Sequence, residues 1–291
     1  MAKSIPDWLK SDLPDTSVLG NVTGVISRLR LNTICFEARC PNKRECFAQS
    51  SVTFLLLGRH CTRRCKFCNV DGKTPEPVDH DEPRRVREAC LALGLKHVIL
   101  TSVTRDDLGD GGASHFVRAI RDLRGEGYSP SVEVLVPDFG GRLASVDIVS
   151  GAGPDVFAHN VETVERLYPQ ARERADYSRT LGILRHVSSK CPGMITKTGL
   201  MLGLGETRGE VNQTLADLSE AGCDIVTVGQ YMQPSNRHLP VKEYIHPRIF
   251  DEVALHARDL GLTAVCGPRV RSSYRAEATF HEARLRRQTC A

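Results

Sequence analysis

The 291-residue sequence contains no run of about 18 apolar residues, the length from which a membrane-spanning helix is inferred. Its first ten residues, Met1 to Lys10, lack the apolar core of a secretory signal peptide, so we expect a cytoplasmic protein with no membrane partner. Aromatic residues make up only 5% of the chain and no basic stripe is interleaved with them, so no nucleic-acid partner is expected. The excess of positive charge is mild, with 39 Lys and Arg against 35 Asp and Glu, and it allows an acidic partner.

Cysteine, by contrast, is plentiful. In a cytosolic protein, eleven cysteines indicate metal ligands or catalytic groups before disulfides. Six of them form two groups, which we name the N-terminal triplet (Cys35, Cys40 and Cys46) and the loop triplet (Cys61, Cys65 and Cys68). The others lie in or beside helix and strand patterns and are interpreted as small buried side chains or inert thiols. They are Cys90, Cys191, Cys223, Cys266 and Cys290.

The loop triplet directly follows the apolar run Thr53 to Gly58, with three and then two residues between its cysteines. A four-iron cluster takes four thiolates, so three cysteines leave one iron open for a substrate or cofactor. A zinc site is the alternative, because thiolates also select zinc. Zinc sites usually carry a second Cys or His pair at a regular offset, and none follows this loop.

From Gly58 onward, apolar β runs alternate with amphipathic helical runs, the pattern of a parallel sheet. Six or seven such units predict an α/β fold, a partial (β/α)6 barrel of the TIM type. An open doubly wound sheet is the competing fold, but its Gly-rich fingerprint is absent after the first strand. The strands are expected at 53–57, 97–103, 132–136, 155–158, 198–202, 224–228 and 263–266. The loop triplet then lies at the C-terminal mouth of the barrel, where such barrels carry their active sites.

The spacing of the loop triplet after a strand resembles the signature of radical S-adenosylmethionine (SAM) enzymes. The resemblance implies that the open iron binds SAM and that the reduced cluster cleaves it to a 5′-deoxyadenosyl radical. It also implies that Gly111 and Gly112 approach the SAM amino group, that Asn160 and Glu162 contact the ribose, and that Gly203 lies under the adenine. Each of these segments has an alternative interpretation as a capped polar loop, a satisfied turn or a tight turn.

Taken together, the two triplets and Arg271-Ser272-Ser273-Tyr274 near the C-terminus resemble the lipoyl synthase family. Further segments match that family in the same order from about Cys35 to Ala276. They are Asp110–Phe116, His159–Thr163, Thr196–Met201 and Gly229–Ser235. The chain departs from the family at Asn69, where Asp is common, and at Gln49-Ser50-Ser51, which replaces a Gly-containing link.

This resemblance implies insertion of two sulfur atoms at C6 and C8 of an octanoyl group that is amide-linked to a carrier protein. The carrier is a lipoyl domain or the glycine-cleavage H protein, and the electron donor is a protein such as flavodoxin or ferredoxin. The resemblance further implies that the loop triplet holds one 4Fe-4S cluster, which acts on SAM. It also implies that the N-terminal triplet holds an auxiliary 4Fe-4S cluster that donates the sulfur, with Ser273 as its fourth ligand and Ser272 as the nearest competitor.

Two alternative functions remain open on the sequence. One is another two-cluster radical SAM enzyme that inserts sulfur, similar to the methylthiotransferases, although no extra binding domain follows the barrel. The other is an iron–sulfur electron carrier, which needs neither an open iron nor a barrel of this length.

The expected organisation has three parts: an extension at 1–50, the barrel at 51–266 and a second extension at 267–291. Residues 1–30 form a polar lead-in with Trp8-Leu9 and Val18-Leu19 as possible packing anchors. Arg284, Arg286 and Arg287 suit steering of an acidic carrier, and a solvated basic tail explains them equally well.

Overall fold

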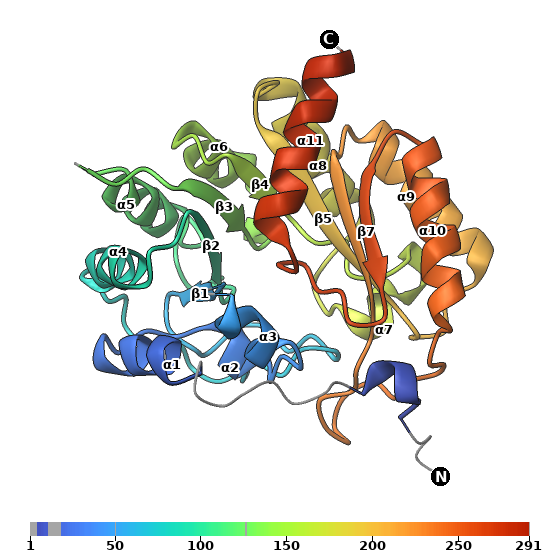
Figure 1. Cartoon of the computed structure of the whole chain (residues 1–291), viewed down its shortest axis with the longest axis horizontal. Coiled ribbons are helices and arrows are strands. Elements are labelled where there is room, and N and C mark those ends of the chain that lie inside the picture. The colour runs from blue at the N-terminus through green and yellow to red at the C-terminus, as the bar shows by residue number, and fades with distance from the viewer. Residues whose placement is uncertain (1–4, 11–18, 50, 126, 291) are drawn as a thin grey trace.

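The computed structural model, which describes residues 5–10, 19–49, 51–125 and 127–290, is built around a seven-stranded parallel sheet (Figure 1). Every strand pairs with the next strand along the chain, without the reversal of order that a doubly wound sheet requires. The first and last strands do not pair with each other in the described part of the chain, so the predicted partial barrel is confirmed, with seven strands. The strands are β1 (Thr53–Leu56), β2 (His97–Ser102), β3 (Ser131–Leu135), β4 (Val156–Ala158), β5 (Ile195–Leu202), β6 (Ile225–Gln230) and β7 (Thr263–Gly267).

Helices cover the outer face of this sheet, as Figure 1 shows. They are α4 (Glu82–Leu93), α5 (Ala113–Leu123), α6 (Leu143–Gly151), the short α7 (Tyr168–Ala171), α8 (Tyr177–Lys190), α9 (Arg208–Glu220) and α10 (Pro247–Asp259). Their ends follow local chemistry. Helix α4 has a proline in its first turn and stops at Gly94, whose φ of 62° suits glycine. Helix α9 starts with a capping box in which Thr207 and Glu210 bond each other's backbone.

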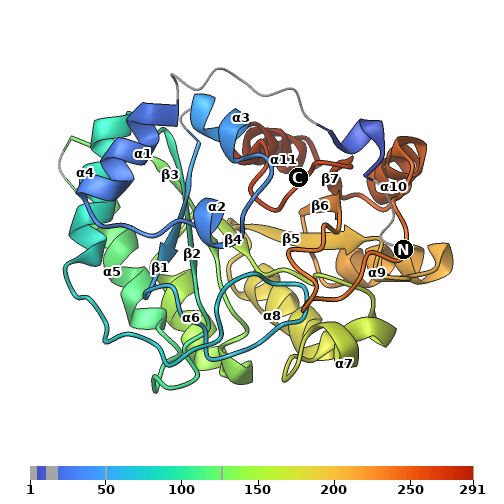
Figure 2. The same ribbon diagram turned by 90° about the horizontal axis from the view of Figure 1, so that it is seen from below.

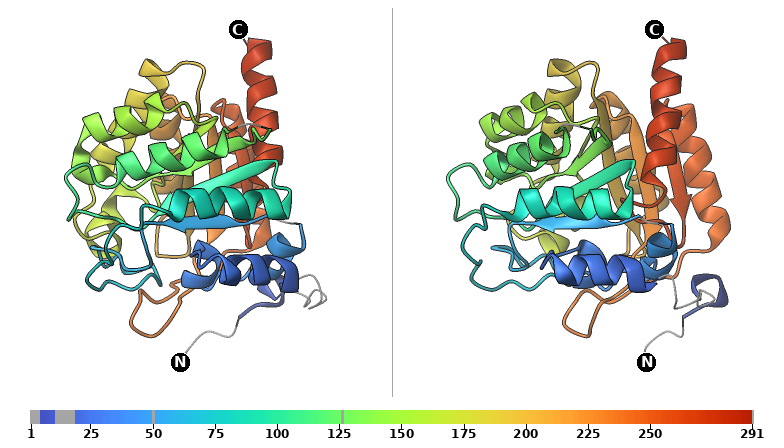
Figure 3. Two further views of the ribbon diagram at one scale, coloured as in Figure 1. Left: turned by 90° about the vertical axis from the view of Figure 1, so that its left-hand side faces the viewer. Right: turned by 60° about the vertical axis from the view of Figure 1, so that its left-hand side comes forward.

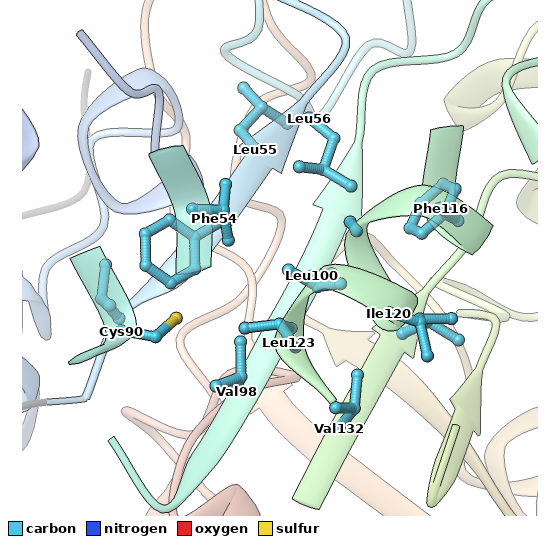
Figure 4. Packing of buried hydrophobic residues seen from close by; sticks show 14 of the residues in the cluster. Phe54, Leu55, Leu56, Cys90, Val98, Leu100, Phe116, Ile120, Leu123 and Val132 are labelled. Carbon is cyan, nitrogen blue, oxygen red and sulfur yellow. The ribbon is translucent and has the colours of Figure 1, made fainter. Parts of the chain in front are cut away.

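The outer core lies between the sheet and these helices, and Figure 4 shows its first half. Side chains from β1, β2 and β3 meet side chains from α4 and α5, so alternate strand residues are buried against helices. The labelled residues are Phe54, Leu55, Leu56, Cys90, Val98, Leu100, Phe116, Ile120, Leu123 and Val132. Cys90 and Cys223 are fully buried, and burial raises the pKa of both thiols, as expected for inert cysteines. No helix among the described residues is long and apolar enough to cross a membrane.

Three helices precede the barrel and were not predicted: α1 (Leu19–Arg28), α2 (Ile34–Glu37) and α3 (Lys43–Ala48). Val22, Val25 and Ile26 of α1 are buried in the same core as β1 and α4. Of the expected anchors, Trp8 lies edge-on to the ring of His246 and is 41% exposed. Val18 lies outside the described residues.

Helix α11 (Ala276–Cys290), also not predicted, packs on the inner face of the sheet. Its Phe280 and Ala283 contact the first residues of three strands, namely Val156, Ile195 and Ile225. These side chains alternate with the outward-facing core residues, so they point to the opposite, concave side. Helix α11 therefore covers the N-terminal end of the barrel, and its C-terminal part extends away from α1–α3, as the two views of Figure 3 show.

The arginines near the C-terminus dock this helix. Arg287 pairs with Asp224 at 2.7 and 2.8 Å, and Arg286 donates a hydrogen bond to the Leu262 carbonyl at 2.9 Å. Both side chains are engaged within the chain, at the end of the barrel opposite the cysteine loop. The interpretation of Arg286 and Arg287 as a steering surface for a carrier is therefore wrong, and of the three only Arg284 is exposed.

Candidate active site

The chain leaves β1 through a turn that aims the loop triplet at the C-terminal mouth. Leu57 and Gly58 both have positive φ, 67° and 87°, and the Leu57 N–H donates to the buried carboxylate of Glu82 at 2.9 Å. The same carboxylate lies 2.8 Å from Nε2 of His115, a residue of the Asp110–Phe116 segment. Helices α4 and α5 thus fix the point at which the cysteine loop begins.

A buried ion-pair network then ties the loop to its neighbours. Arg63, inside the loop triplet, pairs with Asp106 after β2 at 2.9 Å and with Asp138 after β3 at 2.7 Å. Asp138 also pairs with Arg179 of α8 at 2.9 Å. Burial alone would raise the pKa of Asp138, but hydrogen bonds and charge from Arg63 and Arg179 hold it well below its ordinary value. Three βα loops are therefore joined by one guanidinium.

The thiols of the loop triplet lie close to one another. Burial, together with the neighbouring cysteines of the triplet, raises the pKa of Cys65 to about 11 and of Cys68 to about 12. The Cys61 sulfur accepts the N–H of Thr104 at 3.3 Å and that of Arg63 at 3.4 Å. Without a bound metal the Cys65 and Cys68 thiols are therefore protonated, and binding iron must release those protons.

Within the described residues, no group of three or more His, Cys, Asp or Glu side chains is placed to hold one metal ion. A four-iron cluster makes a different demand, because each of its ligands binds a different iron atom and their sulfurs need not converge on one point. Three adjacent thiols on one loop, with two backbone N–H groups directed at the Cys61 sulfur, fit that donor set.

A histidine from the loop after β6 supports the triplet from outside. His238 lies with Nε2 2.9 Å from the Cys68 carbonyl and with Nδ1 2.8 Å from the Ser235 hydroxyl. The Lys66 carbonyl accepts the Leu239 N–H at 2.9 Å. The residues just after the Gly229–Ser235 segment thus contact the cysteine loop, and Ser235 orients His238; the sequence analysis had not assigned this contact.

The segment after β4 faces the same loop. Glu162 has a φ of 65°, which is rare for a residue with a side chain, and two backbone hydrogen bonds to β5 hold it in place. Burial raises its pKa, whereas the guanidinium of Arg172 and a hydrogen bond from Asn160 at 3.1 Å lower it. The Glu162 carboxylate in turn raises the pKa of Cys65 and Cys68, so the structure brings these constellations together.

His159 is buried in the protein interior and contacts the backbone there. Its Nδ1 lies 2.9 Å from the Val136 carbonyl, and burial lowers its pKa to about 4. Of the His159–Thr163 segment, therefore, Glu162 lies beside the loop triplet, Asn160 is hydrogen bonded to Glu162, and His159 is a neutral structural residue.

Gly111, Gly112 and Gly203 have φ values of 64°, 91° and 105°, which favour glycine. A side chain on Gly111 or Gly112 would also collide with Phe139 or Leu57, and one on Gly203 with Gln230. Protein packing accounts for all three glycines, and their contacts with SAM stay predictions.

The N-terminal triplet lies on α2, on the α2–α3 loop and on α3. Burial and the neighbouring thiols raise the pKa of Cys35 to about 11 and of Cys46 to about 12. The loop that carries Cys61, Cys65 and Cys68 contacts this region through the next residue, Asn69. The Asn69 amide donates a hydrogen bond to the Glu37 carbonyl of α2 at 2.7 Å. An Asp at this position, common in the family, would have no proton to donate when ionised. The other departure includes Ser50, which lies outside the described residues.

Residues 268–275, which we name the C-terminal segment, lie against the N-terminal triplet. The Asn42 amide donates to the Arg269 carbonyl at 2.5 Å, and Glu45 accepts from Arg269 at 3.4 Å and from the Tyr274 hydroxyl at 3.0 Å. The guanidinium of Arg271 lies close enough to Cys40 to interact electrostatically with its thiol.

The two serines of this segment differ in their partners. The Tyr274 N–H bonds the Arg271 carbonyl at 2.9 Å, which places Ser272 and Ser273 at the centre of a four-residue turn. The Ser272 hydroxyl donates to Oδ1 of Asn160 at 2.9 Å. The Ser273 hydroxyl has no hydrogen-bond partner among the described residues, so it is the one that is available to another ligand.

The sequence analysis missed a polar pair on the inner face of the barrel. Lys197 of β5 and Glu133 of β3 are almost completely buried and lie 2.8 Å apart, with His97 of β2 at 3.5 Å from Glu133. Phe280 of α11 stacks on the His97 ring and covers this region at the N-terminal end of the barrel. The only available signal was a charged residue within each of two apolar strand runs. Four further site residues were harder to find, because in the sequence they are only polar residues on the loops that follow strands. They are Arg63, Asp106, Asp138 and His238.

Comparison with known proteins matches residues 55–229 to the Radical SAM superfamily. Among curated relatives, "Lipoyl synthase" of Caldicellulosiruptor bescii is 49% identical over 94% of both chains. "Lipoyl synthase" of Nitratidesulfovibrio vulgaris is 49% identical over 95% of this chain and 93% of its own, and that of Methylococcus capsulatus is 48% identical over 94% and 85%.

Solved structures resemble the fold alone. A maturase of the FeFe hydrogenase, HydG, has a TM-score of 0.57 at 12% identity, and covers 92% of this chain and 70% of its own. Methylornithine synthase has a TM-score of 0.56 at 15% identity, with 87% and 78% covered.

We expect Asp138→Asn to lower the free energy of unfolding by about 3 kcal/mol near pH 7, because it removes the more deeply buried of the two carboxylates that pair with Arg63. The Asp138 pKa is lower in the folded than in the unfolded chain, so its contribution is present above about pH 5 and is lost as the pH falls below about 4. Urea denaturation from pH 7 to 3 measures both effects, and the variant should lose less stability over that range.

The matched control is Glu252→Gln, which removes exposed pairs with Arg208 and Arg248 and should cost less than about 1 kcal/mol. Equal losses in the two variants would show that the buried network does not hold the loops.

Proposed function

The chain belongs to the lipoyl synthase family of the Radical SAM superfamily, and we propose that its loop triplet and N-terminal triplet hold the two clusters that the family's reaction needs. The activity is insertion of two sulfur atoms at C6 and C8 of a protein-bound octanoyl group, which gives the lipoyl cofactor. The main support is that the two triplets lie on neighbouring segments of the chain, which are joined by the hydrogen bond between Asn69 and Glu37. The C-terminal segment lies beside them. Relatives of this name over nearly the full chain set aside the methylthiotransferase and electron-carrier alternatives.

A methylene C–H bond of an octanoyl chain cannot be broken by any side-chain base, so a cofactor must supply the reactive species. SAM and 4Fe-4S clusters supply hydrogen abstraction and sulfur when bound. The protein's task is to hold these groups at fixed separation and to keep water out. Helix α11 serves the second purpose by filling the N-terminal end of the barrel.

We assign Cys61, Cys65 and Cys68 to the cluster that acts on SAM. Arg63 holds this loop through Asp106 and Asp138, and His238 holds it through the Cys68 carbonyl. Asn160 and Glu162 are assigned to the ribose, because Glu162 lies beside the loop triplet and the Asn160 amide donates a hydrogen bond to it. Arg172, whose Nη1 donates to the Asn160 carbonyl at 2.9 Å, fixes that peptide and offsets the Glu162 charge.

The auxiliary cluster is assigned to Cys35, Cys40 and Cys46, with Ser273 as fourth ligand. The contacts of Glu45 with Arg269 and Tyr274 support this assignment, since they dock the serine turn on α3. The free hydroxyl of Ser273 favours it over Ser272, which is occupied by Asn160. In this proposal the extensions 1–50 and 267–291 build the auxiliary site, and residues 51–266 build the SAM site.

The carrier protein approaches the C-terminal mouth, because α11 covers the other end of the barrel. The mouth is bordered by loops that carry the exposed cations Arg39, Lys66 and Arg237, and these suit an acidic carrier domain. Figure 2 shows the loops around β1 and those after β6 from this side. The specific carrier, a flavodoxin or ferredoxin donor and a cytoplasmic location stay predictions from the sequence.

Replacing Cys61, Cys65 and Cys68 together with Ala should remove about half of the iron and abolish SAM cleavage, because each four-iron cluster has its own thiolates. Replacing Cys35, Cys40 and Cys46 should also remove about half of the iron but leave SAM cleavage in place. Iron content and 5′-deoxyadenosine formation, measured anaerobically, test both. A loop-triplet variant that keeps all its iron would refute the assignment of two clusters.

Ser273→Cys should assemble the auxiliary cluster and cleave SAM, yet give less complete lipoyl product. A serine oxygen is a hard donor that is poorly matched to iron among soft sulfur ligands, and it leaves readily when the cluster gives up sulfur. Single-turnover product counting on Ser273→Cys beside Ser272→Cys decides the point. Full sulfur insertion by the Ser273 variant would contradict the labile-ligand argument, and impairment of the Ser272 variant alone would move the ligand by one residue.

Arg237→Glu should lower kcat/KM for octanoylated carrier by about three- to tenfold at low salt, because a charge at the rim chiefly changes the association rate. The effect should disappear at high salt and with an octanoyl-lysine peptide. Arg284→Glu is the control, since Arg284 is exposed on α11 at the other end of the barrel. Equal losses with peptide and carrier, or in the control, would contradict this docking side.

A further inference from the structure

The hydrogen bond between Ser272 and Asn160 joins two parts of the protein that the proposed function assigns to different clusters. The Ser272 hydroxyl donates to Asn160 Oδ1 at 2.9 Å across 112 positions of sequence. Asn160 belongs to the segment assigned to SAM, whereas Ser272 precedes the residue assigned to the auxiliary cluster. The inference below rests on those two assignments.

The inner face of the barrel is shaped to allow this contact. A Cβ on Gly199 of β5 would lie 2.9 Å from Asn160 Oδ1, so only glycine leaves the carboxamide its place. A Cβ on Gly229 of β6 would overlap the Val270 carbonyl oxygen. Two inward-facing glycines therefore make room for Asn160 and for the C-terminal segment side by side.

The contact continues in both directions. Asn160 passes a hydrogen bond from its amide group to Glu162 at 3.1 Å, and Glu162 lies beside Cys65 and Cys68. On the other side, the turn that holds Ser272 and Ser273 ends at Tyr274, which bonds Glu45 next to Cys46. Hydrogen bonds and one turn of backbone thus connect Glu162, beside the loop triplet, to Glu45, the residue before Cys46.

We propose that Ser272 is a positioning residue that couples SAM binding at Asn160 and Glu162 to docking of the C-terminal segment at the auxiliary cluster. An amide oxygen accepts two hydrogen bonds, so Asn160 can keep Ser272 while it serves a ribose hydroxyl. A ligand that orders Asn160 then orders Ser272 with it, and the turn delivers Ser273 to its site.

Coupling of this kind is reciprocal. If SAM favours the docked segment by the worth of one neutral hydrogen bond, the docked segment raises SAM affinity by the same factor. One such bond corresponds to about a three- to tenfold change. Through the Ser272 hydroxyl, Ser273 is therefore held more firmly when SAM is bound than when it is absent.

The test is hydrogen–deuterium exchange of the peptide that covers residues 268–275, in the anaerobic protein with both clusters, with and without S-adenosylhomocysteine. In the wild type this ligand should slow exchange of the peptide by about three- to tenfold. Ser272→Ala should keep its iron, lose this response and bind S-adenosylhomocysteine about three- to tenfold more weakly. Ser272→Thr, which retains the hydroxyl, should restore both.

Gly229→Ala gives a second variant with the Ser272 hydroxyl intact but with the segment displaced from β6. It should show fast exchange whether or not the ligand is bound. A response in Ser272→Ala equal to that of the wild type would overturn the coupling, as would loss of auxiliary iron in that variant, because Ser272 would then be a ligand. Exchange does not depend on lipoyl formation, so an absence of product with an intact response would count against the proposed function alone.

Discussion

The site depends first on one buried guanidinium, that of Arg63. It sits inside the loop triplet with a side chain that is 7% exposed, and its partner Asp138 is 1% exposed. Charges buried this deeply are tolerated only when they are paired, so the loops after β1, β2 and β3 are held to one arrangement. Leu57 and Glu82 fix where the cysteine loop starts, and Arg63 fixes where it goes. Cluster ligands on a long loop need such fixation, because a loop with few apolar contacts would not otherwise hold its thiols in place.

A half-open barrel leaves a concave inner face that must be covered. In this chain the cover is formed by its C-terminal part: residues 268–275 lie over Gly229 and bind Asn160, which lies over Gly199, and Phe280 of α11 fills the opposite end. Polar groups that remain inside are matched, as in the Glu133–Lys197 pair. Residues 268–275 both cover the inner face of the barrel and complete the proposed auxiliary site. The site can therefore form only when this segment is packed on the barrel.

The sequence predicted the sheet well because buried parallel strands are continuous apolar runs, and their connecting helices carry clear caps such as Thr207–Glu210. It did not predict α1 or α11. Helix α1 is amphipathic, with Val22, Val25 and Ile26 on its buried face, but Gly20 and Gly24 lower its helix propensity. Helix α11 buries only a narrow stripe that includes Phe280 and Ala283, so it shows no strong helical period. The cysteines could be found because their chemistry is visible in their spacing. The residues that position them could not, because Arg63, Asp138 and His238 meet only through the fold.

The roles of adjacent serines follow from the geometry of a turn. Ser272 and Ser273 occupy its two central positions, where consecutive side chains leave the backbone in different directions. One hydroxyl is taken by Asn160, and the other has no partner among the described residues. In the proposed function the auxiliary cluster releases sulfur, so a hard oxygen donor such as Ser273 suits a bond that has to break better than a fourth cysteine, which would bind iron more firmly. A weakly bound Ser273 then needs another contact that keeps its turn next to the auxiliary site. In the proposed coupling Ser272 provides this contact, because its hydroxyl binds the turn to Asn160, which is assigned to SAM.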